Sequence, residues 1–153
     1  ISVEKEKAYQ EGFRPHLKLL DGLDIFLEKS RRGDIKMAIG SAAILMNIDF
    51  VLDGLGVRKY FSGIVSADDV TRSKPDPETY LKCAGILDVE PGDCLVFEDS
   101  PKGTEAARHA GMDCVVITTM HEPEEFNPAN IIRFTKDFTG HLYESINSNK
   151  EQV

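Results

Sequence analysis

The sequence lacks an excess of positive charge. It has 18 Lys and Arg residues against 26 Asp and Glu residues, so that its formal net charge at pH 7 is -8. A protein that grips nucleic acid needs a basic face for the phosphates, and this charge argues against such a partner. No apolar run approaches the roughly 20 residues that cross a membrane, so we expect no membrane association. A small anionic substrate remains compatible with the charge, because a local cation or metal ion can reverse its sign within one pocket.

The sequence also has few cysteines and no low-complexity tract. Cys83, Cys94 and Cys114 are odd in number, and their spacing fits neither a zinc site nor a redox pair. They are typical of reduced core residues, which predicts a cytoplasmic protein. With 153 residues, 41% apolar and 29% charged, the chain has the size and composition of one soluble globular domain.

Helical and strand patterns alternate along the chain. Apolar residues recur at helical spacing from Ile44 to Leu55, and nearly continuous apolar runs predict strands that helices cover on both faces. This alternation predicts an α/β fold with a Rossmann-like, three-layer core and a mostly parallel sheet. The expected helices cover residues 22–32, 44–55, 77–87, 101–112 and 138–146, and the expected strands cover residues 35–39, 63–65, 95–98, 113–119 and 131–134.

Polar residues follow three of the expected strands. Ser41 follows the first strand, Asp68 and Asp69 follow the second, and Glu98 and Asp99 end the third. In open α/β sheets the ligand site lies beyond the carboxyl ends of the strands. We therefore expect these residues at one edge of the sheet.

The neighbouring acids Glu98 and Asp99 have two interpretations. Like charges on a tight strand-to-helix turn repel each other unless a cation neutralises them, and Mg²⁺ prefers oxygen ligands. Alternatively, Asp99 or Ser100 caps the helix that starts near Pro101. The dipeptide alone does not decide between a metal site and a cap.

Ser41 and Lys74 are similarly ambiguous by themselves. The Ser41 hydroxyl either contacts a phosphate at a helix N-terminus or caps that helix. Lys74 stands in "RSKPDPE", where it is either an ordinary solvated lysine or a point charge that holds a phosphoryl oxygen. The order of the three features, each at the same sheet edge, favours one shared site. We therefore predict that Ser41, Lys74 and Asp99 converge on one pocket.

Three segments closely resemble motifs of the haloacid dehalogenase superfamily, in its β-phosphoglucomutase-like branch of phosphatases and sugar phosphomutases. They are "MAIGSAA", "SKPDPETY" and "CLVFEDSPKGTEAARHAGM". The resemblance implies that Ser41 and Ala42 bind the substrate, and that Lys74 neutralises the phosphoryl group. Ser41 and Lys74 would then be catalytic, and Asp99 with Glu98 would hold Mg²⁺.

Two further features qualify this resemblance. Ala43 stands where many relatives carry a second hydroxyl group, which weakens the phosphomutase interpretation. The loop around Lys74 resembles a tight turn, and because X-Pro bonds adopt the cis form at low cost, we predict a cis bond between Lys74 and Pro75.

The superfamily's first motif, an Asp-x-Asp that supplies the nucleophile, is not found upstream of Ser41. Asp21 and Asp24 lie at the start of a predicted helix rather than after a strand. The chain therefore resembles the carboxyl-terminal part of a larger protein, without the first central strand and most of the helical cap. Residues 1–15 would be a remnant of the cap and hinge, and residues 16–153 an incomplete haloacid dehalogenase-like core. The strands at 35–39 and 95–98 would each lack a neighbour.

The function implied by the resemblance is a Mg²⁺-dependent phosphohydrolase that acts on a small phosphorylated metabolite such as a sugar phosphate. It would proceed through an aspartyl-phosphate whose nucleophile lies outside this chain, so that the chain alone would be inactive. The alternatives are a β-phosphoglucomutase-type sugar phosphomutase and a non-catalytic remnant that binds phosphate or a partner. A retained amino-terminal fragment, a neighbouring chain or residues 1–20 of this chain would complete the sheet.

Overall fold

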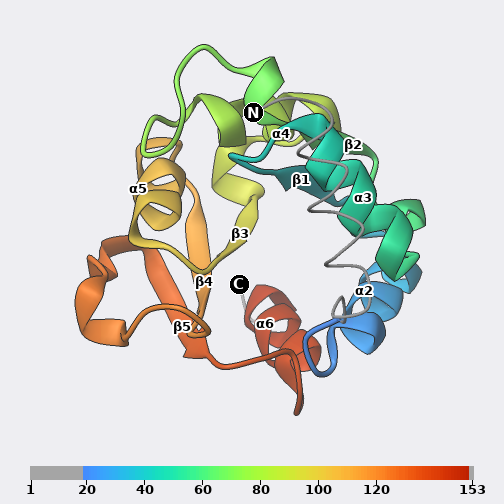
Figure 1. The fold of residues 1–153 in the computed structure, drawn as a ribbon. Helices are drawn as coiled ribbons and strands as arrows, with labels where there is room; N and C mark the ends of the chain where they lie inside the picture. Colours follow the sequence, from blue (N-terminus) through green and yellow to red (C-terminus); the bar gives the residue numbers. More distant parts are fainter. Residues whose placement is uncertain (1–18, 152–153) are drawn as a thin grey trace.

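The computed structural model describes residues 19–151, and the side chains of residues 19–147. The cap remnant predicted at residues 1–15 lies outside these residues. Figure 1 shows strands near the centre of the molecule, with helices around them. The main elements are α2 (Leu23–Arg32), β1 (Ala38–Gly40), α3 (Leu45–Leu55), β2 (Gly63–Val65), α4 (Glu78–Leu87), β3 (Leu95–Glu98), α5 (Pro101–His109), β4 (Asp113–Ile117), β5 (Ile131–Thr135) and α6 (Leu142–Glu151).

All observed strand pairs are parallel, which confirms the predicted α/β class. Strand β1 pairs with β2, so that Ile39 lies opposite Ile64. Strand β4 pairs with β3 on one side and with β5 on the other, so that these three strands form a second sheet. Buried residues follow one another in β4, with Cys114 to Ile117 all buried, as expected for a strand that is covered on both faces.

The predicted elements differ from the observed ones mainly at their ends. The first strand covers Ala38–Gly40 rather than residues 35–39, because β2, its partner within residues 19–151, has three residues to pair with it. The last helix begins at Leu142 rather than at 138. The Phe138 amide donates instead to Asp21 O at 2.9 Å, and this bond ties the segment before α6 to the start of α2.

The hydrophobic core continues across both sheets beneath helix α4. Tyr80, Cys83 and Ala84 of α4 pack in one buried cluster with Val65 of β2 and Val96 of β3. The other clusters belong to one sheet each, the first around α2 and α3 and the second around β4 and α6. Helix α4 therefore joins the two sheets by side-chain packing. Among residues 19–151 no helix is long and apolar enough to cross a membrane.

An apolar groove separates strand β1 from strand β3. Within the described residues, β1 pairs only with β2 and β3 pairs only with β4, so that the facing edges have no ladder partner. Between them lies a cavity of about 590 Å³. Residues 19–151 thus supply no strand between β1 and β3, and the missing central strand stays a prediction. The lining of the cavity includes Phe26, Met37, Ile39, Leu95, Phe97 and Phe138.

Candidate active site

Lys74 lies at the carboxyl ends of the two sheets and connects them. Its ammonium group donates to Gly40 O at the end of β1 at 3.2 Å, and to Glu98 Oε1 at the end of β3 at 2.5 Å. The third acceptor is the Tyr80 hydroxyl, at 2.9 Å from Nζ. The Lys74–Pro75 peptide bond is cis, as predicted. The Lys74 and Glu98 side chains are only 11% and 8% exposed, so this is a buried ion pair.

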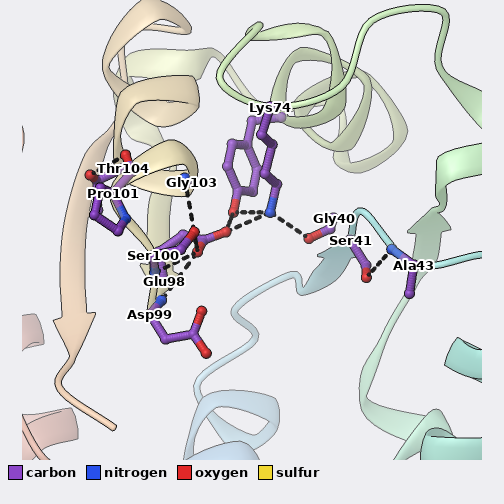
Figure 2. Close-up of polar contacts among 11 residues, drawn as sticks. Gly40, Ser41, Ala43, Lys74, Glu98, Asp99, Ser100, Pro101, Gly103 and Thr104 are labelled. Carbon is purple, nitrogen blue, oxygen red and sulfur yellow. Dashed lines mark hydrogen bonds and ion pairs between the residues drawn. The ribbon is translucent and has the colours of Figure 1, made fainter. Parts of the chain in front are cut away.

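Both carboxylate oxygens of Glu98 are engaged by the protein (Figure 2). Oε1 accepts from Lys74 and from the Tyr80 hydroxyl. Oε2 accepts from the Asp99 amide at 3.1 Å, and from the Ser100 amide and hydroxyl at 3.4 and 3.3 Å. These bonds satisfy a carboxylate that would be costly to bury without partners.

The start of α5 explains how the Glu98 carboxylate fits beside a helix. A Cβ atom at Gly103 would lie 1.9 Å from the Glu98 Cδ atom, which no structure tolerates. Only glycine therefore leaves room for the carboxylate over the first turn of the helix. The Gly103 amide itself donates to Ser100 Oγ at 3.1 Å.

The helix cap distinguishes Asp99 from its neighbours. Ser100 is the N-cap residue of α5, and Pro101 is the first residue of the helix. Capping was thus one correct interpretation of this segment, but it applies to Ser100. The Asp99 side chain is exposed and has no partner within residues 19–147. Figure 2 shows its carboxylate turned away from Gly103 and toward the open side of the site.

Ser41 follows β1 on the opposite side of the same space (Figure 2). Its amide extends the ladder to Val65 O at 2.9 Å, and its Oγ atom accepts from the Ala43 amide at 3.0 Å. The hydroxyl thus orders the turn before α3 rather than capping the helix, whose N-cap residue is Ile44. Lys74 bonds to Gly40 and Glu98, the residues that precede Ser41 and Asp99 in the chain, and the shared pocket of Ser41, Lys74 and Asp99 stays a prediction.

The other predicted pair of acids has a structural role. Asp68 Oδ2 accepts from the Leu45 amide at 3.1 Å and so occupies a free donor at the start of α3. Asp69 accepts from the Ser66 amide and hydroxyl at 2.8 and 2.9 Å, within a capping box. Both acids stabilise turns at the sheet edge.

Burial perturbs the ionisable groups beneath Lys74. Desolvation, followed by the charge of Glu98 and the hydrogen bond to it, holds the pKa of Tyr80 well above its ordinary value, so that this phenol stays protonated. Burial also raises the pKa of Cys83 to about 11 and that of Cys114 to about 12. These thiols are core residues, as the sequence predicted.

The donor set supports part of a Mg²⁺ site. The Asp99 carboxylate is a free, hard oxygen ligand of the kind that Mg²⁺ prefers. The Glu98 oxygens already accept five hydrogen bonds from described residues. No cluster of three His, Cys, Asp or Glu residues suited to a metal occurs in the described part of the chain. Asp99 thus fits as one ligand, and the others would come from water, phosphate or residues outside the described part.

Two residues of the site escaped the sequence analysis. Tyr80 connects Lys74 to Glu98, and Gly103 makes room for Glu98. Both lie within the quoted motifs, but the residue types tyrosine and glycine in a helix give no sign of which polar side chain they contact. The position of Gly103 is the signal that could have identified it, because glycine is common just beyond the end of a helix and not in its first turn.

Comparison with known proteins identifies the family. The model for the family described as "Haloacid dehalogenase-like hydrolase" matches residues 2–117. The fructose-1-phosphate phosphatase YqaB of Escherichia coli is 39% identical over 115 residues, which are 75% of this chain and 60% of that protein. The chloroplastic 5-amino-6-(5-phospho-D-ribitylamino)uracil phosphatase of Arabidopsis thaliana is 35% identical over 132 residues, which are 86% of this chain and 35% of that protein.

Solved structures agree with the sequence comparison. The CbbY protein of Rhodobacter sphaeroides, in complex with phosphate, superposes with a TM-score of 0.76 at 26% identity, over 87% of this chain and 62% of that one. A putative β-phosphoglucomutase of Thermotoga maritima has a TM-score of 0.72 at 30% identity, over 87% and 60% of the two chains. This chain spans only 35–60% of the length of the two phosphatases. It belongs to the haloacid dehalogenase-like hydrolase family.

Proposed function

We propose that this chain is the core of a Mg²⁺-dependent phosphohydrolase that acts on a small phosphorylated metabolite, with sugar phosphates as the first class to test. The observation that carries this proposal is the position of Lys74, a buried cation between the carboxyl ends of β1 and β3. The Ser41 hydroxyl and the Asp99 carboxylate lie on either side of it (Figure 2). Relatives whose names state phosphatase activity on fructose 1-phosphate and on validoxylamine A 7'-phosphate support the substrate class.

Each of these residues has a role that matches its contacts. Lys74 would offset the charge of the phosphoryl group, and Ser41 and Ala42 would bind its oxygens at the end of β1. Three acceptors already surround Nζ, so a phosphoryl oxygen would share or replace the longest contact, the 3.2 Å bond to Gly40 O. Asp99 would be a ligand of Mg²⁺, with Glu98 beside it as the residue that orients Lys74. When bound, the ion would supply positive charge for the phosphoryl oxygens.

The groove between β1 and β3 supports the proposal that the nucleophile lies on another segment. An extended apolar strand would satisfy the facing backbone edges and fill the cavity of about 590 Å³. Its carboxyl end would reach the space beside Lys74, because parallel strands end at the same edge. An aspartate at that end could attack phosphorus and form an aspartyl-phosphate. The strand would belong to a longer form of this protein, to a retained fragment or to a neighbouring chain.

Two other functions remain as alternatives to be tested. A phosphomutase would return the phosphoryl group to a second hydroxyl of the sugar, and the absence of a hydroxyl at Ala43 favours the hydrolase. A non-catalytic binding protein would keep phosphate affinity at Lys74 without turnover.

The experiment compares residues 1–153 alone with the same residues together with the segment encoded upstream. A panel of sugar phosphates is tested for release of inorganic phosphate, with Mg²⁺ and with EDTA. We expect turnover only with both the added segment and Mg²⁺. Full turnover by residues 1–153 alone would show that the nucleophile lies within this chain, and phosphate binding without any turnover would support the binding protein.

Two lysine variants identify the site in the same assay. Lys74→Met removes the buried ammonium group, and we expect it to abolish turnover. Lys82→Met is the matched control, because the Lys82 ammonium group also donates to a carbonyl, Asp69 O, and pairs with a carboxylate, that of Glu78 at 3.4 Å, but is exposed and does not line the groove. Equal loss of activity in both variants would contradict the assignment of Lys74.

A further inference from the structure

The Tyr80 hydroxyl lies between the two charged groups of the candidate active site. Tyr80 belongs to the first turns of α4 and is 6% exposed. Its hydroxyl donates to Glu98 Oε1 and accepts from Lys74 Nζ at 2.9 Å. The Lys74 ammonium group also lies 4.6 Å from the centre of the Tyr80 ring.

Tyr80 completes the coordination of the ammonium group. A lysine ammonium has three N–H donors, and the described acceptors are also three: Gly40 O, the Tyr80 hydroxyl oxygen and Glu98 Oε1. Three bonds from three different elements fix the position of Nζ. With the tyrosine oxygen removed, one N–H would have no partner and Nζ could turn about the remaining two bonds.

Tyr80 also fixes the Glu98 carboxylate. The hydroxyl proton goes to Oε1, while Oε2 accepts from the Ser100 hydroxyl and the amides at the start of α5. The carboxylate is thus held from both ends and cannot rotate.

The Tyr80 ring has a separate, structural role. It belongs to the buried cluster beneath α4, and a Cβ atom at Gly40 would lie 3.1 Å from its Cε1 atom. A phenylalanine ring would fill the same space. Packing therefore explains an aromatic residue at this position, and only the bonds to Lys74 and Glu98 explain the hydroxyl.

We propose that Tyr80 is a positioning residue, whose hydroxyl holds the Lys74 ammonium group and the Glu98 carboxylate in the geometry that receives a phosphoryl group. This inference deepens the proposed function and rests on it for the identity of the ligand. The positions of the ammonium and the carboxylate themselves rest on the contacts alone.

The test compares Tyr80→Phe with Tyr60→Phe. Tyr60 is a matched control, since its hydroxyl also donates to a glutamate, Glu28 Oε2 at 3.0 Å, but has no lysine as a donor. The first measurement is the ¹H–¹⁵N NMR signal of the Lys74 ammonium group, assigned by its loss in Lys74→Met. A buried ammonium with three acceptors exchanges its protons slowly. We expect exchange at least about tenfold faster in Tyr80→Phe and unchanged in Tyr60→Phe.

The second measurement is turnover by the form of the protein that hydrolyses sugar phosphates. Because a mispositioned ammonium stabilises the transition state less, we expect kcat to fall roughly tenfold in Tyr80→Phe while KM changes less than about twofold. Replacement of Tyr80 by 4-aminophenylalanine restores a donor and an acceptor on the same ring, and should restore both the slow exchange and kcat.

The outcomes separate this inference from the proposed function. Slow ammonium exchange and an unchanged kcat in Tyr80→Phe would overturn it, and so would a folded 4-aminophenylalanine protein that recovers neither property. If no form of the protein hydrolyses phosphates, the proposed function fails, and the ammonium exchange of the same variants still decides the role of Tyr80.

Discussion

Replacing Gly103 with alanine should displace Glu98 and release Lys74. The added methyl group would lie 1.9 Å from the Glu98 Cδ atom and 2.1 and 2.3 Å from its two carboxylate oxygens. The backbone of the first helical turn cannot retreat far, because Ser100 caps it and Thr104 packs at 1% exposure. The carboxylate must therefore move away from its partners.

The magnitude follows from two opposing contributions. Losing one partner of a buried ion pair costs roughly 3–5 kcal/mol, and the Lys74 and Glu98 side chains are 11% and 8% exposed. Alanine is favoured over glycine in a helix by roughly 0.5–1 kcal/mol. We therefore expect Gly103→Ala to lower the free energy of unfolding by about 2–4 kcal/mol.

Gly85→Ala is the matched control for this substitution. Gly85 is exposed in α4, and a Cβ atom there would have no neighbour within 4 Å. Alanine should raise the stability by about 0.5–1 kcal/mol at this position. Urea unfolding followed by circular dichroism measures both variants. A Gly103→Ala protein as stable as Gly85→Ala would refute the contact between Gly103 and Glu98.

Three further predictions concern the charges and thiols. Glu98→Gln should lower the free energy of unfolding by about 3–5 kcal/mol, because it leaves the Lys74 ammonium group buried without a counter-charge. The double variant Lys74→Met with Glu98→Leu should recover most of this loss in urea unfolding, and a double variant as unstable as Glu98→Gln would argue against the ion pair. With pKa values of about 11 and 12, Cys83 and Cys114 are less than roughly one part in a thousand thiolate at pH 8, so that Ellman's reagent should modify them only after unfolding. Hydrogen bonds from the loop before Lys74 lower the pKa of Glu78 to about 2, so these bonds should persist above pH 4.5 and be lost as the pH falls toward 2. The amide chemical shifts of the loop report the loss of these bonds, and a midpoint near pH 4.5 would contradict the prediction.

The sequence predicted the class of the fold and the residues that meet at the site. Strand and helix periodicities located each main element, and the polar residues at strand ends located Ser41 and Asp99. These features are local, because they depend on which residues follow a strand. The cis bond before Pro75 was also predictable, since the loop resembled that of the family.

Features that depend on contacts between different elements of the fold could not be predicted from the sequence. Whether Ser100 or Asp99 caps α5 is decided by the side chain that reaches the Gly103 amide, and either residue type can do so. The Tyr80 hydroxyl bonds to Glu98, 18 positions away, and helical periodicity marks Tyr80 only as a buried residue. The short β1 likewise reflects the length of its partner β2 rather than the apolar run that begins at Ile35.

The packing beneath α4 and the bonds of Lys74 bear on the stage of assembly at which the candidate site is complete. No backbone ladder joins β1 to β3 in the described residues, so the spacing between Ser41 and Asp99 depends on these side chains and on whatever fills the groove. The proposed chemistry and the assembly of the sheet would thereby be coupled, because the nucleophile would reach the space beside Lys74 only when a strand fills the groove. Under the proposed function, a molecule whose groove is empty would leave phosphorylated metabolites intact until that strand is in place.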